Sequence, residues 1–221
     1  MTPEPVWQIA LFTAVAALAA TALALVPALA IAWGLARGRF RGKALVETLV
    51  TLPLVLPPVA TGLLLLWLVG PIGPVGRMAA AAGVEIVFTW KAVVLAMGVM
   101  GLPLLVRTAR AGFEQNTRRY EQIAETLGAS RWRVFTTVTL PLAARPILGG
   151  TLLAFARALG EFGATIVIAG SIPGRTRTLA SGMYAAIETG QDSAVLSLLV
   201  VSVGLAVAAV VVSNRLTAER A

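Results

Sequence analysis

The 221-residue chain contains no cysteine and no histidine. It therefore cannot form disulfide bonds, metal sites with thiolate or imidazole ligands, or catalytic sites that pair histidine with serine or cysteine. Acidic residues number only ten, and neither an HExxH metal motif nor a GxxxxGK[ST] phosphate-binding loop occurs. We predict no metal and no cofactor in this chain, and no enzyme activity of its own, including ATP hydrolysis.

Charge is also scarce, since only 13% of residues are charged while 58% are hydrophobic, and the mean hydropathy is +0.87. These values indicate an integral membrane protein whose main surroundings are the lipid bilayer. The net charge of +8 does not indicate a nucleic-acid partner, because the basic residues flank apolar runs and form no soluble basic face.

Five apolar stretches predict an all-α polytopic membrane protein, with five transmembrane helices in one domain that covers residues 1–221. The predicted spans are about 6–33, 48–69, 86–106, 146–169 and 194–212, and a longer polar segment lies at about 107–145. The second stretch contains Pro53, Pro57 and Pro58, which remove backbone donors. A bent helix that lines a transport path is one interpretation, and a purely structural kink is the other.

The distribution of lysine and arginine predicts the topology of the chain. Thirteen of these residues fall on the side that contains segment 107–145 and the C-terminus, and four fall on the opposite side. The positive-inside rule places the richer side in the cytoplasm, so the N-terminus is predicted outside and the C-terminus inside. No internal repeat is visible, which argues against a repeat-built secondary carrier. One copy is small, and a homodimer with a path between its subunits is the economical arrangement.

Segment 117–127 is predicted to form a short amphipathic helix outside the membrane, because it is too short and too charged to span. Tyr120, Ile123, Ala124 and Leu127 share one face at helical spacing. Asn116 or Thr117 can cap its start, Gly128 suits the left-handed residue at its end, and Ser130 can cap a second short helix. Spacing alone allows two interpretations, a helix on the membrane surface or a helix that docks into a groove of a partner protein.

The same segment resembles the EAA motif of the membrane subunits of bacterial ABC importers. It has Gln122, Ile123 and Ala124, three residues, Gly128, nine residues, and then a run that ends in Leu140 and Pro141. The motif's glutamate position holds Gln122, with Glu121 beside it. The resemblance implies a coupling helix that sits in a cleft of an ATPase subunit, through Tyr120, Glu121, Gln122, Ile123, Ala124, Leu127, Gly128 and Ala129.

Residues 41–62 and 157–190 are similar to the molybdate branch of the type I ABC importers. This resemblance implies the permease fold of that class and a multi-pass subunit of the bacterial inner membrane that imports a tetrahedral oxyanion, most simply molybdate. Sulfate and tungstate permeases share much of this sequence. The implied partners are a second copy of the chain, two ATPase subunits that bind ATP and magnesium, and a periplasmic or extracellular oxyanion-binding protein. A channel or secondary carrier that needs no ATPase is the alternative from another class.

Arg157 and Glu161 are four residues apart in the predicted fourth span, so their side chains can pair. The pair either orients this helix at a dimer interface or lies beside the transport path. Segment 171–177 carries two arginines and is predicted to be an external loop, which either attracts an anion, contacts a substrate-delivering protein or is merely solvated. The predicted residues of the path or gate are Pro57, Pro58, Arg157, Glu161, Phe162, Gly163 and Thr165.

Overall fold

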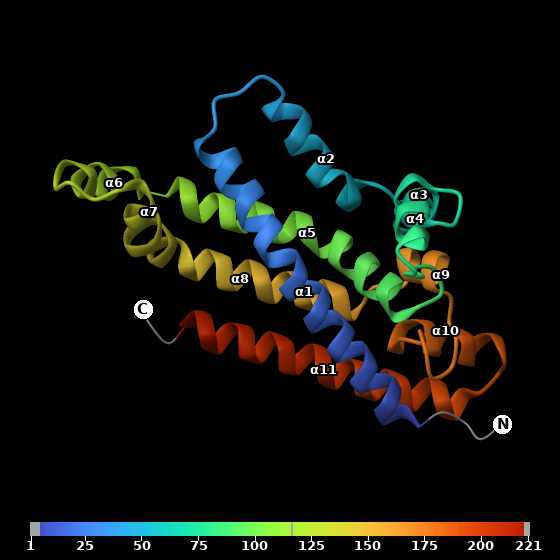
Figure 1. Ribbon diagram of the computed structural model, residues 1–221. Helices are drawn as coiled ribbons and strands as arrows, with labels where there is room; N and C mark the ends of the chain where they lie inside the picture. Colours follow the sequence, from blue (N-terminus) through green and yellow to red (C-terminus); the bar gives the residue numbers. More distant parts are fainter. Residues whose placement is uncertain (1–4, 116, 219–221) are drawn as a thin grey trace.

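The computed structural model describes residues 5–115 and 117–218 of the chain, which form helices joined by short connections (Figure 1). Their order is α1 (Val6–Arg37), α2 (Lys43–Val55), α3 (Pro58–Val69), α4 (Pro74–Ala81), α5 (Trp90–Glu114), α6 (Thr117–Thr126), α7 (Arg131–Val134), the π-helix η1 (Phe135–Thr139), α8 (Leu140–Leu159), α9 (Gly163–Ala169), α10 (Leu179–Glu188) and α11 (Asp192–Ala218).

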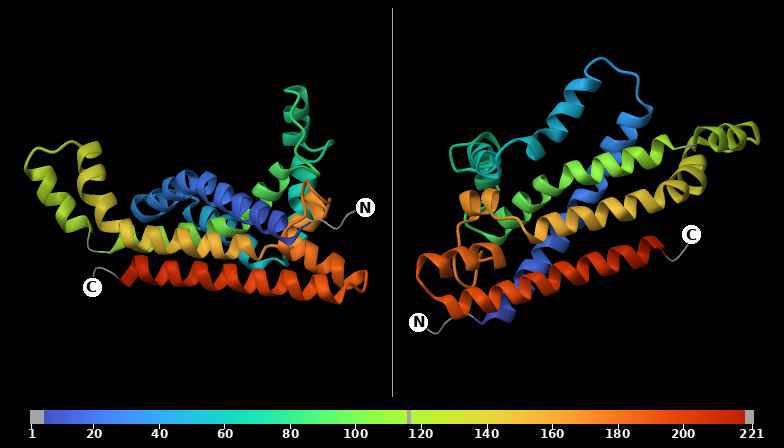
Figure 2. Two further views of the ribbon diagram at one scale, coloured as in Figure 1. Left: turned by 90° about the horizontal axis from the view of Figure 1, so that it is seen from below. Right: turned by 180° about the vertical axis from the view of Figure 1, so that it is seen from behind.

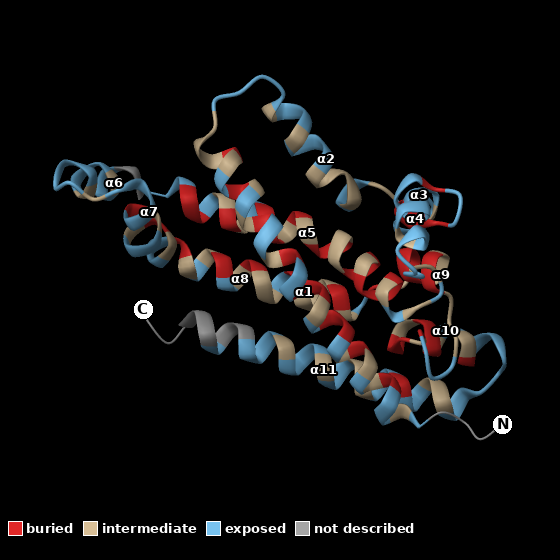
Figure 3. Cartoon of the chain, viewed as in Figure 1, coloured by how far each residue is buried: buried red, intermediate tan, exposed pale blue. Residues whose placement is uncertain are grey.

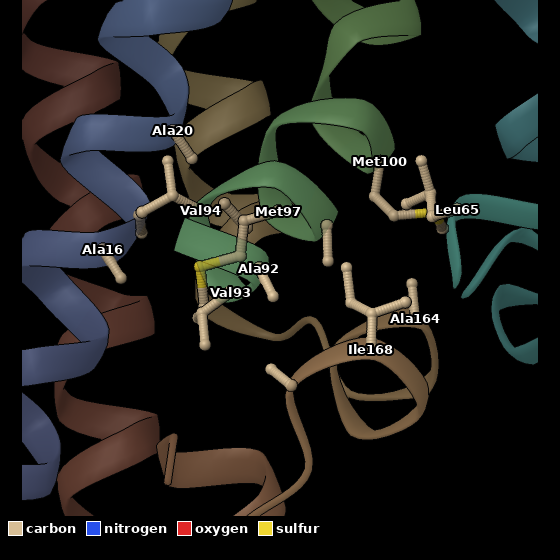
Figure 4. Packing of buried hydrophobic residues seen from close by; sticks show 14 residues of the cluster. Ala16, Ala20, Leu65, Ala92, Val93, Val94, Met97, Met100, Ala164 and Ile168 are labelled. Carbon is tan, nitrogen blue, oxygen red and sulfur yellow. The ribbon is translucent and has the colours of Figure 1, made fainter. Parts of the chain in front are cut away.

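Helix α5 lies at the centre of the fold and packs along its length against α1 and α8. Small residues allow these helices to approach closely, since a Cβ atom added at Gly101 of α5 would lie 3.2 Å from the carbonyl oxygen of Ala154 in α8. Figure 4 shows the main core cluster, in which Met97 of α5 lies between the alanines of α1 and Ile168 of α9. A second cluster around Phe113 joins the same three long helices nearer to α6.

Helix α11 runs beside the group formed by α1, α5 and α8 but contributes little to the core (Figures 1 and 3). Only 6% of its apolar stretch is buried, compared with 61% for α5. A long apolar helix that is exposed on most sides requires an apolar environment, either lipid or another protein surface. The start of α1 and the end of α11 lie at opposite ends of the bundle, and α6 and α7 share the end where α11 finishes (Figures 1 and 2).

Four helical segments are long and apolar enough to cross a membrane, namely Val6–Arg37, Trp90–Glu114, Arg131–Leu159 and Asp192–Val212. A fifth crossing is obtained if α2 and α3 count as one broken span. The all-α membrane fold is therefore confirmed. Helix α5 continues to Glu114 and α8 begins at Leu140, so helical structure extends into both ends of the predicted cytoplasmic segment 107–145.

The second predicted span, at 48–69, is broken, because α2 and α3 meet at an angle of 119°. The bend that its prolines predicted is therefore present. The break falls at Leu56 and Pro57, both of which have extended backbone. A residue before proline disfavours the helical conformation, and Leu56 and Pro57 each precede one. Pro58 then occupies the first turn of α3, where no backbone donor is needed. Pro53 remains inside α2.

The predicted fourth span at 146–169 also contains a break. Helix α8 ends at Leu159, and α9 starts at Gly163. Glu161 therefore lies between two helices and not within one. Gly160 ends α8 in a non-helical conformation (φ −92°, ψ 12°), and Phe162 (φ −127°, ψ −54°) redirects the chain into α9.

Two further helices lie at the end of the bundle opposite α6 and had not been predicted (Figure 1). Pro74 is in the first turn of α4, and Thr178 and Ser181 form a capping box at the start of α10. The Leu179 N–H donates to the Thr13 hydroxyl at 2.9 Å, which ties α10 to α1. The sequences at the starts of α4 and α10 both contain residues that favour a helix start. The apolar stretches of these two helices are too short to indicate a span.

Candidate functional sites

Helix α6 carries an exposed apolar face at one end of the molecule (Figures 1 and 3). Tyr120 is 55% exposed, Ile123 50% and Leu127 82%, while Ala124 between them is half-buried. Gln122 is exposed beside this face. Helix α6 contacts the rest of the chain mainly at η1, α7 and the end of α5, so its apolar side remains open. Such a surface matches the anchors of a helix that binds in a partner's groove.

A tight turn ends α6 and leads into α7. Gly128 has the predicted left-handed backbone (φ 84°), and the Ala129 N–H donates to the Ala124 carbonyl at 3.1 Å. The Ser130 hydroxyl then accepts from the Arg133 N–H at 3.4 Å and caps α7, as predicted. The proposed cap residue Asn116 lies outside the described residues. The side chain of Thr117, the other proposed cap, also lies outside the described part.

Glu121 is held inside the chain by two interactions. Its Oε1 atom lies 2.5 Å from Nη2 of Arg37, at the end of α1, and accepts a hydrogen bond from the Thr139 hydroxyl at 2.6 Å. The side chains of Glu121 and Arg37 are each only 16% exposed. Among the predicted coupling residues, this one points into the molecule and contacts residues far away in the sequence.

Aromatic contacts fix the π-helix that follows. The ring of Phe135 lies 5.9 Å from those of Trp33 and Trp132 and 6.5 Å from that of Phe113. A cavity of about 950 Å³ lies between α1 and the α6–α8 segment, with Trp33, Phe135 and the Arg37–Glu121 pair among its lining residues. The α6–α7 unit therefore contacts α1 through a few specific side chains and not through a continuous packed face.

The predicted path residues gather around the break between α8 and α9. Arg157 Nη1 lies 2.7 Å from Glu161 Oε2, but these atoms are not aligned for a hydrogen bond. Glu161 Oε1 accepts the Ala164 N–H at 2.8 Å and so satisfies a free donor at the start of α9. Glu161 is 1% exposed and Arg157 is 28% exposed. The predicted pairing is thus present, although no helix joins the two residues.

Helix α9 lies against α3 at very close range. A Cβ atom at Gly163 would lie 2.6 Å from Cβ of Pro58, and one at Gly62 would lie 2.9 Å from Cα of Ala164. The hydroxyls of Thr61 and Thr165 are buried at this contact and have no hydrogen-bond partner among the described residues. No local pattern indicates Thr61 or Gly62, because their relation to α9 depends on the α2–α3 bend.

The remaining predicted path residues are less deeply placed. Pro57 is exposed at the bend. The ring of Phe162 lies 5.1 Å from that of Tyr184 in α10, at an interplanar angle of 40°. A hydrogen bond and negative charge from Glu188 raise the pKa of the exposed Tyr184 phenol above its ordinary value. The structure therefore brings Pro58, Glu161, Gly163 and Thr165 together and leaves Pro57 at the edge.

A polar cavity of about 580 Å³ lies at the ends of α1 and α5 that are far from α6, and its lining residues include Glu85, Lys91 and Arg175. Arg175 belongs to the predicted external loop. Lys91 Nζ donates to the Glu85 carbonyl at 3.2 Å. Among the described residues, no three acidic side chains lie close enough together to hold a metal ion.

Comparison with known proteins identifies the family. Residues 27–218 match the model of the binding-protein-dependent transport system inner membrane component. The chain is 45% identical over 223 residues to the molybdenum transport system permease protein ModB of Escherichia coli K12, which covers 99% of this chain and 97% of the relative. It is 34% identical over 160 residues to the sulfate transport system permease protein CysT of the same organism, which covers 72% and 58% of the two chains.

The fold is also similar to a solved structure, a bacterial ABC transporter involved in the import of the acidic polysaccharide alginate. The TM-score is 0.63 at 16% identity, with 95% of this chain and 79% of that chain covered. At this identity the likeness concerns the fold alone. The family match and the near full-length relative together show that this multi-pass membrane chain belongs to the family of inner membrane components of binding-protein-dependent transport systems.

Proposed function

We propose that this chain is the permease subunit of an ATP-driven importer for molybdate. The observation that carries the proposal is the 45% identity to ModB across nearly the whole of both chains. The lower identity and shorter coverage of the sulfate permease favour molybdate over sulfate. Tungstate has the same charge and tetrahedral shape, so it remains the nearest alternative substrate.

In this proposal two copies of the chain enclose the path. The apolar surfaces of α11 and of α3 support it, because a single copy leaves Trp67, Val203 and neighbouring side chains exposed. Closed two-fold symmetry is the commonest arrangement for such subunits. The α8–α9 break, with its buried ion pair and unpartnered hydroxyls, then lies beside the path.

Each copy binds one ATPase subunit through the apolar face of α6. Three large apolar side chains in this helix are at least half exposed to solvent, which favours a protein partner over isolation in water. ATP and magnesium bind to that partner, and a binding protein outside the cell delivers the anion. Closure of the ATPase pair moves the two coupling helices and switches the side from which the path is open.

Reconstitution tests this proposal directly. The chain is purified together with an ABC ATPase subunit of the same organism, placed in liposomes and supplied with binding proteins for molybdate, tungstate or sulfate. We expect ATP-dependent uptake that is fastest with molybdate. Uptake without ATPase or ATP would favour a channel or secondary carrier, and preference for sulfate or tungstate would reassign the substrate.

A further inference from the structure

We infer that Glu121 is a positioning residue that fastens the coupling helix α6 to the ends of α1 and α8, and that it makes no contact with the ATPase. The inference rests on the proposed function, because it assumes that α6 is the site of ATPase coupling. It assigns to Arg37, Glu121 and Thr139 the task of making α6 move together with the membrane-spanning helices. These three residues are called the latch below.

The geometry of Glu121 favours an internal role. Its carboxylate is mostly buried and already has a cation and a hydroxyl as partners, at 2.5 and 2.6 Å. At about 100° per residue, Glu121 lies roughly a third of a turn from the middle of the exposed face formed by Ile123 and Leu127. A partner that covers this face meets apolar side chains, while the carboxylate points to the chain's own helices.

The direction of the Thr139 hydroxyl is a second, independent observation. Thr139 is 1% exposed, and its hydroxyl donates to a carboxylate 18 residues away. Other threonine hydroxyls in long helices donate to the carbonyl four residues before them, as those of Thr13, Thr21, Thr108 and Thr151 do. Thr139 is therefore committed to the α6 contact and not to its own helix.

The π-helix explains how Thr139 reaches this position. Its wider turn is closed by the Leu140 N–H, which donates to the Phe135 carbonyl five residues back. A π-turn adds one residue to a helix and so rotates the following side chains by about 100°. The turn thus sets the direction of Thr139 toward Glu121, at the start of the long helix α8.

Few other contacts set the direction of α6 relative to α1. Helix α6 has ten residues, which is too short for a stable isolated helix, so tertiary contacts must set its direction. Its packing against α1 is slight, and a cavity of about 950 Å³ is lined by residues of α1, α6, α7, η1 and α8. The ion pair between Glu121 and Arg37 is therefore a direct polar contact from α6 to α1. A charge-assisted hydrogen bond is short and geometrically specific. We therefore expect it to keep α6 in place relative to α1 better than a loose apolar contact would.

Charge substitutions test the latch in the reconstituted complex. Glu121→Gln removes the ion pair with little change of shape, and Glu125→Gln removes an exposed carboxylate one turn later as the matched control. We expect Glu121→Gln to retain the ATPase subunit through purification but to transport on the order of 10-fold less anion per ATP hydrolysed. The control should behave like the unchanged protein. The exchanged pair Arg37→Glu with Glu121→Arg should recover most of the coupling, which a mere change of local packing would not allow.

A distance measurement separates this inference from the proposed function. The chain has no cysteine, so spin labels can be attached at Ala22→Cys on α1 and Thr126→Cys on α6 without removing native thiols. Glu121→Gln should broaden the distance distribution between these labels, and Glu125→Gln should not. Unchanged distances together with unchanged coupling would overturn the latch. Loss of the ATPase from Glu121→Gln, not restored by the exchanged pair, would make Glu121 a direct contact. Failure of the unchanged chain to bind the ATPase would instead overturn the proposed function.

Discussion

The break between α8 and α9 offers a quantitative test, because Glu161 performs two separable tasks. Its Oε1 atom accepts the Ala164 N–H, and its Oε2 atom pairs with Arg157. Glu161→Gln retains an oxygen that can accept the N–H but removes the charge. Glu161→Ala removes both. The difference between these variants therefore contains the hydrogen bond at the start of α9 together with the packing of the buried side chain.

The magnitudes follow from burial. Loss of the hydrogen bond to a free helix donor costs about 1 kcal/mol. Removing one partner of a fully buried ion pair costs about 3–5 kcal/mol, but Arg157 is 28% exposed and recovers part of its hydration, so we expect about 2 kcal/mol for this pair. The predicted losses in the free energy of unfolding are thus about 2 kcal/mol for Glu161→Gln and about 3 kcal/mol for Glu161→Ala.

Unfolding of the purified chain in detergent micelles, followed by circular dichroism during titration with a denaturing surfactant, measures these losses. The double variant Arg157→Gln with Glu161→Gln should lose less than Glu161→Gln alone, because no unpaired charge remains. Glu85→Gln changes an exposed carboxylate and should stay within about 0.5 kcal/mol of the unchanged chain. Equal stability of Glu161→Gln and the unchanged chain, or a double variant no better than the single one, would refute the reasoning.

Three other changes give clear expectations. Gly128→Val should reduce co-purification of the ATPase, because a β-branched residue disfavours the left-handed backbone by about 1–2 kcal/mol, whereas Gly128→Asn should be tolerated; normal recovery of the valine variant would contradict this. Gly62→Ala should lower the free energy of unfolding by about 1–3 kcal/mol through overlap with the α9 backbone, whereas Gly204→Ala, in open space on α11, should be neutral or stabilising; equal effects would exclude the close contact. A reporter protein fused after Arg119 should report the cytoplasm, and an external signal would reverse the predicted topology.

The sequence predicted the long helices because their signal is local. Some twenty apolar residues in succession suffice to indicate a span. Helices α1 and α11 contain the whole predicted stretch, and α5 contains all of it except the first four residues. Proline also correctly indicated a disturbance in the second stretch. Its place and size were not predictable, because Pro53 is accommodated inside α2 whereas Pro57 and Pro58 end it. Pro57 and Pro58 in succession restrict the backbone of Leu56 and Pro57, which ends α2 at this point.

The candidate sites also differ in whether their residues are related by local sequence or only by the fold. The exposed face of α6 follows from helical spacing within one segment, so Tyr120, Ile123 and Leu127 were found from sequence. The partner of Glu121 was not, because Arg37 lies 84 residues away and no local pattern relates the two. For Glu161 the predicted partner was right although the helix was broken, since four residues of separation allow contact through a turn as well as through a helix.

Two of the described ion pairs, Arg37–Glu121 and Arg157–Glu161, are built in a similar way. Arg37, in the last turn of α1, pairs with Glu121 of the short helix α6. Arg157, in the last turn of α8, pairs with Glu161, which lies just before the short helix α9. Each glutamate also accepts a second donor, the Thr139 hydroxyl or the Ala164 N–H. An arginine at a helix C-terminus is favoured by the helix dipole, so the cation is in place before the contact forms.

These ion pairs give two short helices a directional contact to the long helices. Helices α6 and α9 have ten and seven residues and cannot hold a direction by their own hydrogen bonds. Apolar contacts between small side chains, such as those of α5 with α1 and α8, permit sliding because they have little directionality. Charged pairs are directional and costly to break inside the molecule. Each of these short helices is thus held by a directional contact to the long helix whose arginine pairs with its glutamate.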